Sequence, residues 1–169
     1  MTTVFGCTDT RGIVQIAWSF VDRGGNSVFP GPLGDTCSFH GVVDGADRSF
    51  DLRVAVRLCD PECSAGCGDD GCLLVDPLVY SCLGARGSSE VPAMDTPYEF
   101  KVEVLADLGS ECTCVIEEPC AEVPGPRLRM VRTGLITDLQ VYQLVLGLAS
   151  PSQAELSLEG CCALPPGCL

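Results

Sequence analysis

The sequence predicts an all-β protein: an antiparallel two-sheet sandwich with disulfide-stapled loops and a short cysteine-rich C-terminal tail. Three observations predict it. Apolar and polar residues alternate with a period of two, the pattern of strands that bury one face. Turn-forming stretches rich in Gly, Pro, Asp and Asn separate these segments. Thirteen cysteines in 169 residues approach the density of a disulfide scaffold.

Three segments alternate most clearly, residues 13–20, 50–58 and 98–106, and we expect each to be a half-buried strand. The side chains expected to face the core are Val14, Ile16, Trp18, Phe20, Phe50, Leu52, Val54, Val56, Leu58, Tyr98, Phe100, Val102 and Val104. The charged side chains expected to face water are Asp51, Arg53, Arg57, Glu99, Lys101 and Glu103. We interpret Trp18 as a core anchor and not as a ligand platform.

Weaker strand patterns follow at 78–82, 112–117 and 127–132, and residues 135–146 predict a strand buried on both faces. About seven strands separated by turn-forming stretches are typical of a sandwich. The tail leaves two alternatives open. Ser150 to Gln153 resemble a helix-capping box before a short helix, whereas alternating Ala154, Leu156 and Leu158 suit a strand equally.

The predicted organisation is one domain with appendages. A chain of 169 residues can bury about 70% of its extended surface, so one apolar core is sufficient. We expect an N-terminal anchor or linker at 1–10, the sandwich at 11–148, and a Cys/Pro-rich tail at 149–169 that packs on the sandwich.

The cysteines predict the compartment. Cys7 stands alone near the N-terminus, and the other twelve can form six disulfides. They are Cys37, Cys59, Cys63, Cys67, Cys72, Cys82, Cys112, Cys114, Cys120, Cys161, Cys162 and Cys168. Disulfides persist outside the reducing cytosol, so we expect an extracytoplasmic protein, whether periplasmic, on the outer-membrane surface or secreted.

The sequence does not determine the disulfide connectivity, because twelve cysteines can pair in about ten thousand ways. The four cysteines within 59–72 are expected to pair among themselves and with Cys82. Vicinal Cys161 and Cys162 would form a strained ring if bonded to each other, so each should have its own partner. Together with Cys168 they should attach the tail to the body, which adds about 3 kcal/mol for a loop of about 15 residues.

Cys7 is the candidate for lipidation. In a bacterial lipoprotein signal an aliphatic and two small residues precede the modified cysteine; Val4 and Gly6 fit this pattern and Phe5 does not. The alternative is an ordinary cysteine that pairs or stays free. The six preceding residues form no signal peptide, so we expect an export signal either upstream of Met1 or already removed. No apolar run reaches eighteen residues, the length of a membrane-spanning helix.

The net charge of −13, from 23 acidic and 10 basic residues, restricts the partners. Nucleic-acid binding needs Lys and Arg to neutralise phosphates, so we expect none. The same charge repels an anionic membrane, so membrane contact is expected only through a lipid on Cys7. The expected partner is a protein or polymer ligand at the cell surface, and the sequence indicates no oligomeric state.

The densest chemical cluster is C-D-P-E-C-S-A-G-C-G-D-D-G-C at 59–72. Zinc sites favour two cysteines separated by two residues, but here the gaps are three, three and four, so a disulfide-knotted loop is the favoured interpretation. Its carboxylates are the candidates for a calcium site, although the alternating Asp/Asn pattern of a calcium loop is absent. These candidates are Asp60, Glu62, Asp69 and Asp70.

No motif predicts catalysis. His40 is the only histidine, no G-x-S-x-G turn exists, and oxidised cysteines supply no thiolate nucleophile. A pair of carboxylates can still form a hydrolase, but no pair stands out among 23 acids. No glycine motif that cradles phosphate is present, so we expect no cofactor.

The chain resembles cysteine-rich, myxobacteria-like lipoproteins with an immunoglobulin-like sandwich. The resemblance covers residues 7–146 and lies in C-T-D at 7–9, I-A-W-S-F at 16–20, F-D-L-R-V-A-V-R-L at 50–58 and V-P-A-M-D-T-P-Y-E-F-K-V-E-V at 91–104. The last segment is similar to a strand entry found in many immunoglobulin-like and prealbumin-like modules. The resemblance implies an exported, envelope-tethered module and no catalytic residues.

The function expected from these observations is a non-enzymatic, exported and envelope-anchored module that binds a ligand or serves structurally. Two alternatives stay open. One is an extracytoplasmic hydrolase that depends on calcium or another metal. The other is a reduced, cytosolic zinc-binding protein.

Overall fold

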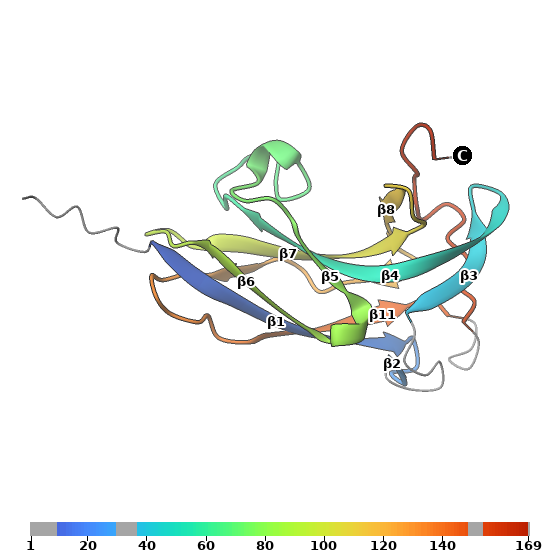
Figure 1. The fold of residues 1–169 in the computed structure, drawn as a ribbon, viewed down its shortest axis with the longest axis horizontal. Helices are drawn as coiled ribbons and strands as arrows, with labels where there is room; N and C mark the ends of the chain where they lie inside the picture. The colour runs from blue at the N-terminus through green and yellow to red at the C-terminus, as the bar shows by residue number, and fades with distance from the viewer. Residues whose placement is uncertain (1–9, 30–36, 149–153, 169) are drawn as a thin grey trace, which may run out of the picture.

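A computed structural model describes residues 10–29, 37–148 and 154–168. In these ranges the chain forms strands and two single-turn 3-10 helices, η1 (Asp70–Cys72) and η2 (Cys82–Gly84) (Figure 1). The strands are β1 (Arg11–Asp22), β2 (Ser27–Phe29), β3 (Ser38–Val43), β4 (Ala46–Cys59), β5 (Leu78–Ser81), β6 (Arg86–Pro92), β7 (Tyr98–Asp107), β8 (Thr113–Val115), β9 (Ala121–Glu122), β10 (Arg127–Arg129) and β11 (Gln140–Leu146). The predicted all-β class is confirmed.

The strands form two sheets packed face to face, as predicted (Figure 1). The first sheet has the order β2-β1-β11-β9, with β6 also paired to β1. The second has the order β10-β7-β4-β3, with β5 beside β4 and β8 beside β7. One pair departs from the antiparallel rule: β1 and β11 are parallel, with Trp18 opposite Tyr142. Parallel strands need a crossover connection, and the long path through the second sheet supplies it.

The core lies between the sheets and uses the predicted faces. Every side chain expected to point inward from the three long strands is buried. Trp18 donates from its indole Nε1 to the carbonyl oxygen of Cys82 at 3.3 Å. Its ring stacks on Tyr80 of the second sheet, with ring centroids 5.8 Å apart. The interpretation of Trp18 as a core anchor is therefore confirmed.

Two side chains expected to face water are buried. Arg57 is 9% exposed and Glu103 is 7% exposed, so this part of the prediction is wrong. The reason for Arg57 is that the loop after β4 folds back over the outer face of the second sheet, where the Arg57 Nε donates to the Cys67 carbonyl oxygen at 2.7 Å. Glu103 is paired with Lys101 on the same face at 2.8 Å.

Sequence patterns missed four strands and misjudged one. β2 and β9 are very short, β6 is almost entirely polar, and the alternation of β3 is interrupted by Gly41. The strand predicted over 135–146 begins only at Gln140, and Val141 is 58% exposed, so burial on both faces is wrong. Residues before Gln140 still follow β1, because Ile13 donates to the Leu135 carbonyl oxygen at 3.0 Å.

The tail follows the strand alternative where it is described. The His40 amide donates to the Ala154 carbonyl oxygen at 2.8 Å, and the Leu156 amide donates to the His40 carbonyl oxygen at 2.9 Å. Leu156 and Leu158 are buried and belong to the same core as the sandwich. The capping box expected at 150–153 lies outside the described residues.

Six disulfides join all twelve cysteines that the structure describes. The pairs are Cys37–Cys82, Cys59–Cys67, Cys63–Cys72, Cys112–Cys168, Cys114–Cys162 and Cys120–Cys161. Pairing within the 59–72 loop, separate partners for the vicinal cysteines and attachment of the tail are confirmed. Pairing of that loop with Cys82 is wrong, because β5 carries Cys82 to the start of β3. Cys7 lies outside the described residues.

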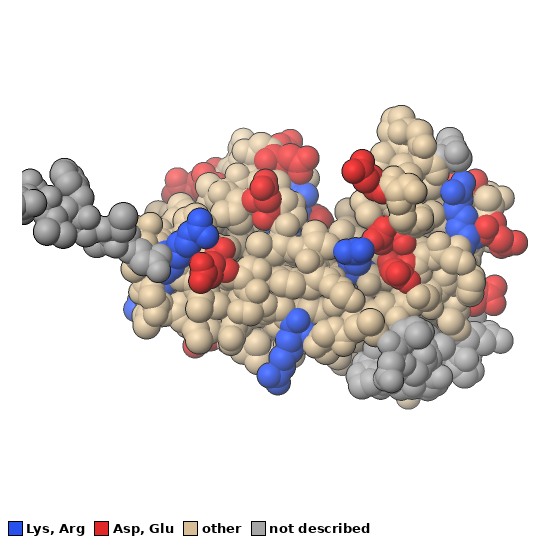
Figure 2. All heavy atoms as spheres, viewed as in Figure 1, with Lys and Arg blue, Asp and Glu red and all other residues tan. Residues whose placement is uncertain are grey.

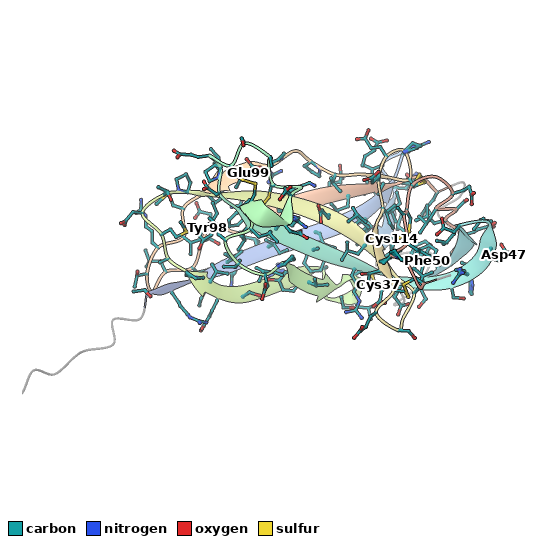
Figure 3. The ribbon with its side chains drawn as sticks, turned by 90° about the horizontal axis from the view of Figure 1, so that it is seen from above. Cys37, Asp47, Phe50, Tyr98, Glu99 and Cys114 are labelled. Atoms are coloured by element: carbon teal, nitrogen blue, oxygen red, sulfur yellow. A yellow bond between two sulfur atoms is a disulfide. The ribbon has the colours of Figure 1, made fainter. Side chains whose placement is uncertain are left out.

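The disulfides fit an oxidising, extracytoplasmic environment. Among the described residues, no helix is long and apolar enough to cross a membrane. Figure 3 shows Cys37, Phe50 and Cys114 toward one end of the sandwich, with Asp47 at its tip and Tyr98 and Glu99 toward the other end.

Candidate functional site

Three regions bring together side chains with binding or chemical potential. The first is the acidic loop between Cys59 and Cys72. The second is a row formed by His40, Ser49 and Glu155 across neighbouring strands. The third lies along β10, the start of β11 and the segment that joins them.

The acidic loop is closed by two overlapping disulfides and carries the four calcium candidates, and Figure 2 shows acidic side chains at its crest. Asp60 accepts from the Glu62 amide at 2.9 Å, and Asp69 accepts from the Gly71 amide at 2.7 Å. Asp70 is 2.7 Å from the Arg57 guanidinium. Local backbone groups and an arginine therefore already engage three of the four carboxylates.

The structure does not gather these carboxylates into a cation site. In the described ranges, no group of three or more His, Cys, Asp or Glu side chains is placed to hold a metal ion. The loop cysteines are bonded in pairs, so they present no thiolates to zinc. The loop covers Arg57 and is held by it against the outer face of the second sheet.

His40, Ser49 and Glu155 lie side by side on the outer face of the second sheet. Ser49 Oγ and His40 Nδ1 are hydrogen-bonded at 2.8 Å, and Glu155 is the parallel bridge partner of His40. They line a shallow depression of about 460 Å³ together with Gly41, Asp47, Arg48 and Ala154. All three side chains are exposed.

A serine hydrolase needs more than this row provides. Its histidine is held by a carboxylate through one ring nitrogen, while the other nitrogen takes the serine proton, beside donors that stabilise an oxyanion. Among the described residues no bond joins Glu155 to the His40 ring. The row supplies a hydrogen-bonding surface, and within the described ranges His40 has no buried carboxylate partner.

The third region is an exposed apolar surface that contains three arginines, and we call it the arginine–apolar surface. Three of the ten large apolar side chains exposed in the described part of the chain, Met130, Leu135 and Ile136, gather here beside Arg129 and Arg132. The third arginine, Arg127, lies with Arg129 near Tyr142. Leu128 and Val141 are also exposed, but their strand partners Glu99 and Ala17 place them on opposite outer faces of the sandwich. A hollow of about 340 Å³ in this surface is lined by Arg129, Met130, Arg132, Leu135, Ile136, Thr137 and Asp138.

The backbone of this surface is fixed to the sandwich. Val131 is fully buried, so it anchors the segment that follows β10. The Leu135 amide donates to the Arg132 carbonyl oxygen at 3.2 Å, closing a tight turn in which Gly134 has a φ of 68°. A turn with positive φ at its third residue favours glycine there. Arg132 and Leu135 are therefore presented together, at the two ends of one turn.

Two of the arginines also close one side of the sandwich, between β10 in the second sheet and β11 in the first. Arg127 donates to the Val141 carbonyl oxygen at 3.1 Å, and its guanidinium lies 4.6 Å from the centre of the Tyr142 ring. Arg129 donates to the Gln140 side-chain oxygen at 2.7 Å. These bonds hold the two guanidinium groups in defined positions while leaving other N–H donors free to bind.

The positive potential of the surface acts on Tyr142. Burial raises the pKa of the Tyr142 hydroxyl, and the nearby charges of Arg127 and Arg129 oppose part of that rise. Among the described residues, the Tyr142 hydroxyl is buried without a hydrogen-bond partner. The two arginines thus influence the core as well as the surface.

Comparison with known proteins identifies no relative. No protein-family model, no curated protein and no solved structure matches the chain.

The sequence draws attention to the acidic loop and to His40, and it predicts no role for residues 127–141 beyond strand formation. The alternation of R-L-R-M-V-R at 127–132 indicates a strand, which hides the fact that Leu128 and Met130 stay exposed. The available signal was the concentration of three arginines within six residues of a strongly acidic chain.

Proposed function

We propose that this protein is a non-enzymatic, extracytoplasmic binding module that recognises its ligand through the arginine–apolar surface. The observation that carries the proposal is the gathering of the exposed Met130, Leu135 and Ile136 beside Arg129 and Arg132 around one hollow of the described structure. Scattered apolar side chains are normal on a protein surface, whereas a contiguous apolar patch rimmed by polar groups is typical of an interaction site.

The rest of the molecule supports a scaffold role. Six disulfides fix the loops and the tail on two packed sheets. A rigid scaffold lowers the ordering cost of binding, because the recognition surface is already arranged before the ligand arrives. Segments on such a scaffold are common positions for binding residues.

The same proposal includes an envelope location and a lipid on Cys7. A lipid anchor attaches a strongly acidic protein to a membrane whose surface would otherwise repel it. The immunoglobulin-like character is also part of the proposal. It is supported by the Tyr98 hydroxyl, which donates to the Pro92 carbonyl oxygen six residues upstream at 2.8 Å, the contact made in a tyrosine corner.

In-cell photo-crosslinking tests the proposed function. A photoreactive amino acid is placed at Leu135, which is 55% exposed on the arginine–apolar surface, in protein exported to an oxidising compartment. The matched control places it at Leu83, which is 61% exposed elsewhere. We expect a discrete covalent adduct from position 135 and none from position 83. Equal labelling from both positions, or no adduct from either, would refute the proposal.

A further inference from the structure

We infer that the arginine–apolar surface binds an acidic polypeptide segment, one in which carboxylates alternate with apolar side chains. This inference rests on the proposed function and names the chemical class of its partner. It is carried by the charge distribution of the chain, by the fixed positions of the arginines and by the apolar side chains between them.

The charge distribution is unusual for such an acidic protein. Acidic residues outnumber basic ones by 23 to 10, so most basic side chains should have a carboxylate close by. Five of the ten basic side chains do form an ion pair. In the described part of the chain, Arg127, Arg129 and Arg132 have no carboxylate oxygen within 4.0 Å of their charged nitrogens. The guanidinium groups of Arg129 and Arg132, which border one hollow, therefore remain available to carboxylates from outside, with Arg127 near Arg129 at Tyr142.

Two of the arginines are also held ready to bind. Arg129 is oriented by the Gln140 side chain, which itself donates to the Asp138 carbonyl oxygen at 2.7 Å. Arg127 is oriented by the Val141 carbonyl oxygen and the Tyr142 ring. The planar guanidinium group matches a carboxylate through two parallel N–H···O bonds. Fixing the guanidinium beforehand reduces the entropy lost when such a pair forms.

The apolar side chains decide which kind of anion fits. Leu135 and Ile136 line the same hollow as Arg129 and Arg132. A purely polar polyanion such as a sulfated or phosphorylated polysaccharide would desolvate these side chains without covering them with apolar groups. A polypeptide with alternating acidic and apolar residues offers both kinds of contact within a few ångströms, as recognition patches with arginine and apolar anchors require.

Two other occupants are disfavoured by charge. A flat anionic bilayer would contact a wide area of this acidic molecule and be repelled by it. A short peptide contacts only the local positive surface, because charges more than about 8 Å apart are largely screened at physiological salt. A symmetric pairing of two copies through this surface would bring two positively charged patches together. Both arrangements bring extended surfaces of like charge together, whereas a short acidic peptide meets Arg129 and Arg132 along with the one carboxylate, Asp138, that lines the hollow in the described structure.

Peptide display tests the inference. A library of random twelve-residue peptides is selected on the immobilised, fully oxidised chain, and the same library is selected on two double variants. One variant, Arg132→Gln with Leu135→Ser, changes the surface. The matched control, Arg86→Gln with Leu83→Ser, changes an exposed arginine and leucine elsewhere. Enriched peptides are then synthesised with a fluorophore, and their affinities are measured by fluorescence anisotropy.

We expect enriched peptides to be rich in Asp and Glu interspersed with apolar residues. We expect at least a tenfold loss of affinity in the Arg132→Gln, Leu135→Ser variant, less than a twofold change in the control, and weaker binding at high salt. Peptides without carboxylate enrichment, affinity that is independent of salt, or equal affinity for both variants would overturn the inference. An adduct from position 135 in the crosslinking experiment would then leave the binding function standing and reject only the acidic partner.

Two further measurements test the other candidate occupants of this surface, a second copy of the chain and an anionic membrane. Light scattering during size-exclusion chromatography should give the mass of one chain at all concentrations, and a dimer abolished by Leu135→Ser would show that a second copy covers the surface. Vesicles of phosphatidylglycerol and phosphatidylethanolamine should not bind the unlipidated chain. Binding to such vesicles that is lost in the surface variant would replace the peptide by a membrane and overturn the inference.

Discussion

Arg57 Nε donates to the carbonyl oxygen of Cys67 at 2.7 Å, beneath a loop that two disulfides close. The same guanidinium reaches the Asp70 carboxylate at 2.7 Å, so one strand residue holds two points of the loop. Short disulfide loops have few apolar contacts of their own. Here a buried charged side chain supplies the link that apolar packing would give elsewhere, and it fixes the loop against the outer face of the second sheet.

Replacing Arg57 should loosen this loop. Arg57→Met retains most of the aliphatic stem but leaves the Cys67 carbonyl oxygen without its donor. We expect a loss of about 1–3 kcal/mol in the free energy of unfolding, the cost of leaving a buried polar group unsatisfied. Urea unfolding under non-reducing conditions measures the loss, and hydrogen exchange should show faster exchange within 60–72.

The control for this prediction is Arg86→Met, which changes an exposed arginine. Its effect should stay within about 0.5 kcal/mol, as for most surface substitutions. If both variants unfold at the same urea concentration as the unchanged protein, Arg57 does not hold the loop.

The burial of Arg57 shows where a sequence pattern stops being informative. Alternation correctly placed Arg57 on the outer face of its strand, because side-chain direction follows from the local backbone. Whether that face meets water depends on a loop that returns from another part of the chain. Alternation also fails to predict the polar strand β6, for a related reason. This strand is held by its pairing with β1, so its own sequence needs no alternation of apolar and polar residues.

The disulfides differ in how strongly they should stabilise the fold. Cys37–Cys82 spans 45 residues and Cys59–Cys67 spans 8. A cross-link restricts the unfolded chain more when its loop is longer, so Cys37→Ala with Cys82→Ala should cost about 4 kcal/mol. The corresponding change at Cys59 and Cys67 should cost about 2.5 kcal/mol.

All four of these cysteines are buried, so the cavity left by alanine affects both variants similarly and the comparison isolates the loop length. Urea unfolding of the two double variants without reductant gives the difference. A larger loss for the short loop would show that local strain or packing, and not chain entropy, determines what these bridges contribute.

The three tyrosines predict how stability depends on alkaline pH. Burial raises the pKa of Tyr80, Tyr98 and Tyr142 above the ordinary value of 10.0. Below that pH the phenols are protonated in both states, so they do not change the free energy of unfolding. As the pH rises above it, the unfolded chain releases phenolic protons first, and stability should fall by about 1.4 kcal/mol per pH unit for each tyrosine that stays protonated in the fold.

Tyrosinate absorbance during a pH titration, followed alongside circular dichroism, checks this expectation. Ionisation of the tyrosines should coincide with loss of structure. In Tyr98→Phe, the decline of stability with pH should be shallower because one titrating group is gone. Full ionisation near pH 10 in a protein that remains folded would contradict the assignment of burial as the cause.

The candidate site was less predictable than the fold for a physical reason. The alternation of the long strands predicts which of their side chains face the core, but the arginine–apolar surface depends on which side chains near β10 stay uncovered. Leu128 pairs with Glu99 of β7, so its side chain lies on the outer face of the second sheet, where it is 53% exposed. Which set of alternating residues faces the core is set by the register with the neighbouring strand, and the alternation of one segment does not contain that register.

The tail gives the last prediction, because its contact with β3 requires a glycine. A Cβ atom on Gly41 would overlap the Leu156 carbonyl oxygen. Gly41→Ala should therefore displace residues 154–158 and expose Leu156 and Leu158, each of which gains about 2 kcal/mol from burial. We expect a loss of about 2–4 kcal/mol in urea unfolding and faster proteolysis of the tail. Gly84→Ala is the control, because its Cβ meets open space. Equal stability of the two variants would mean that the tail is not part of the core.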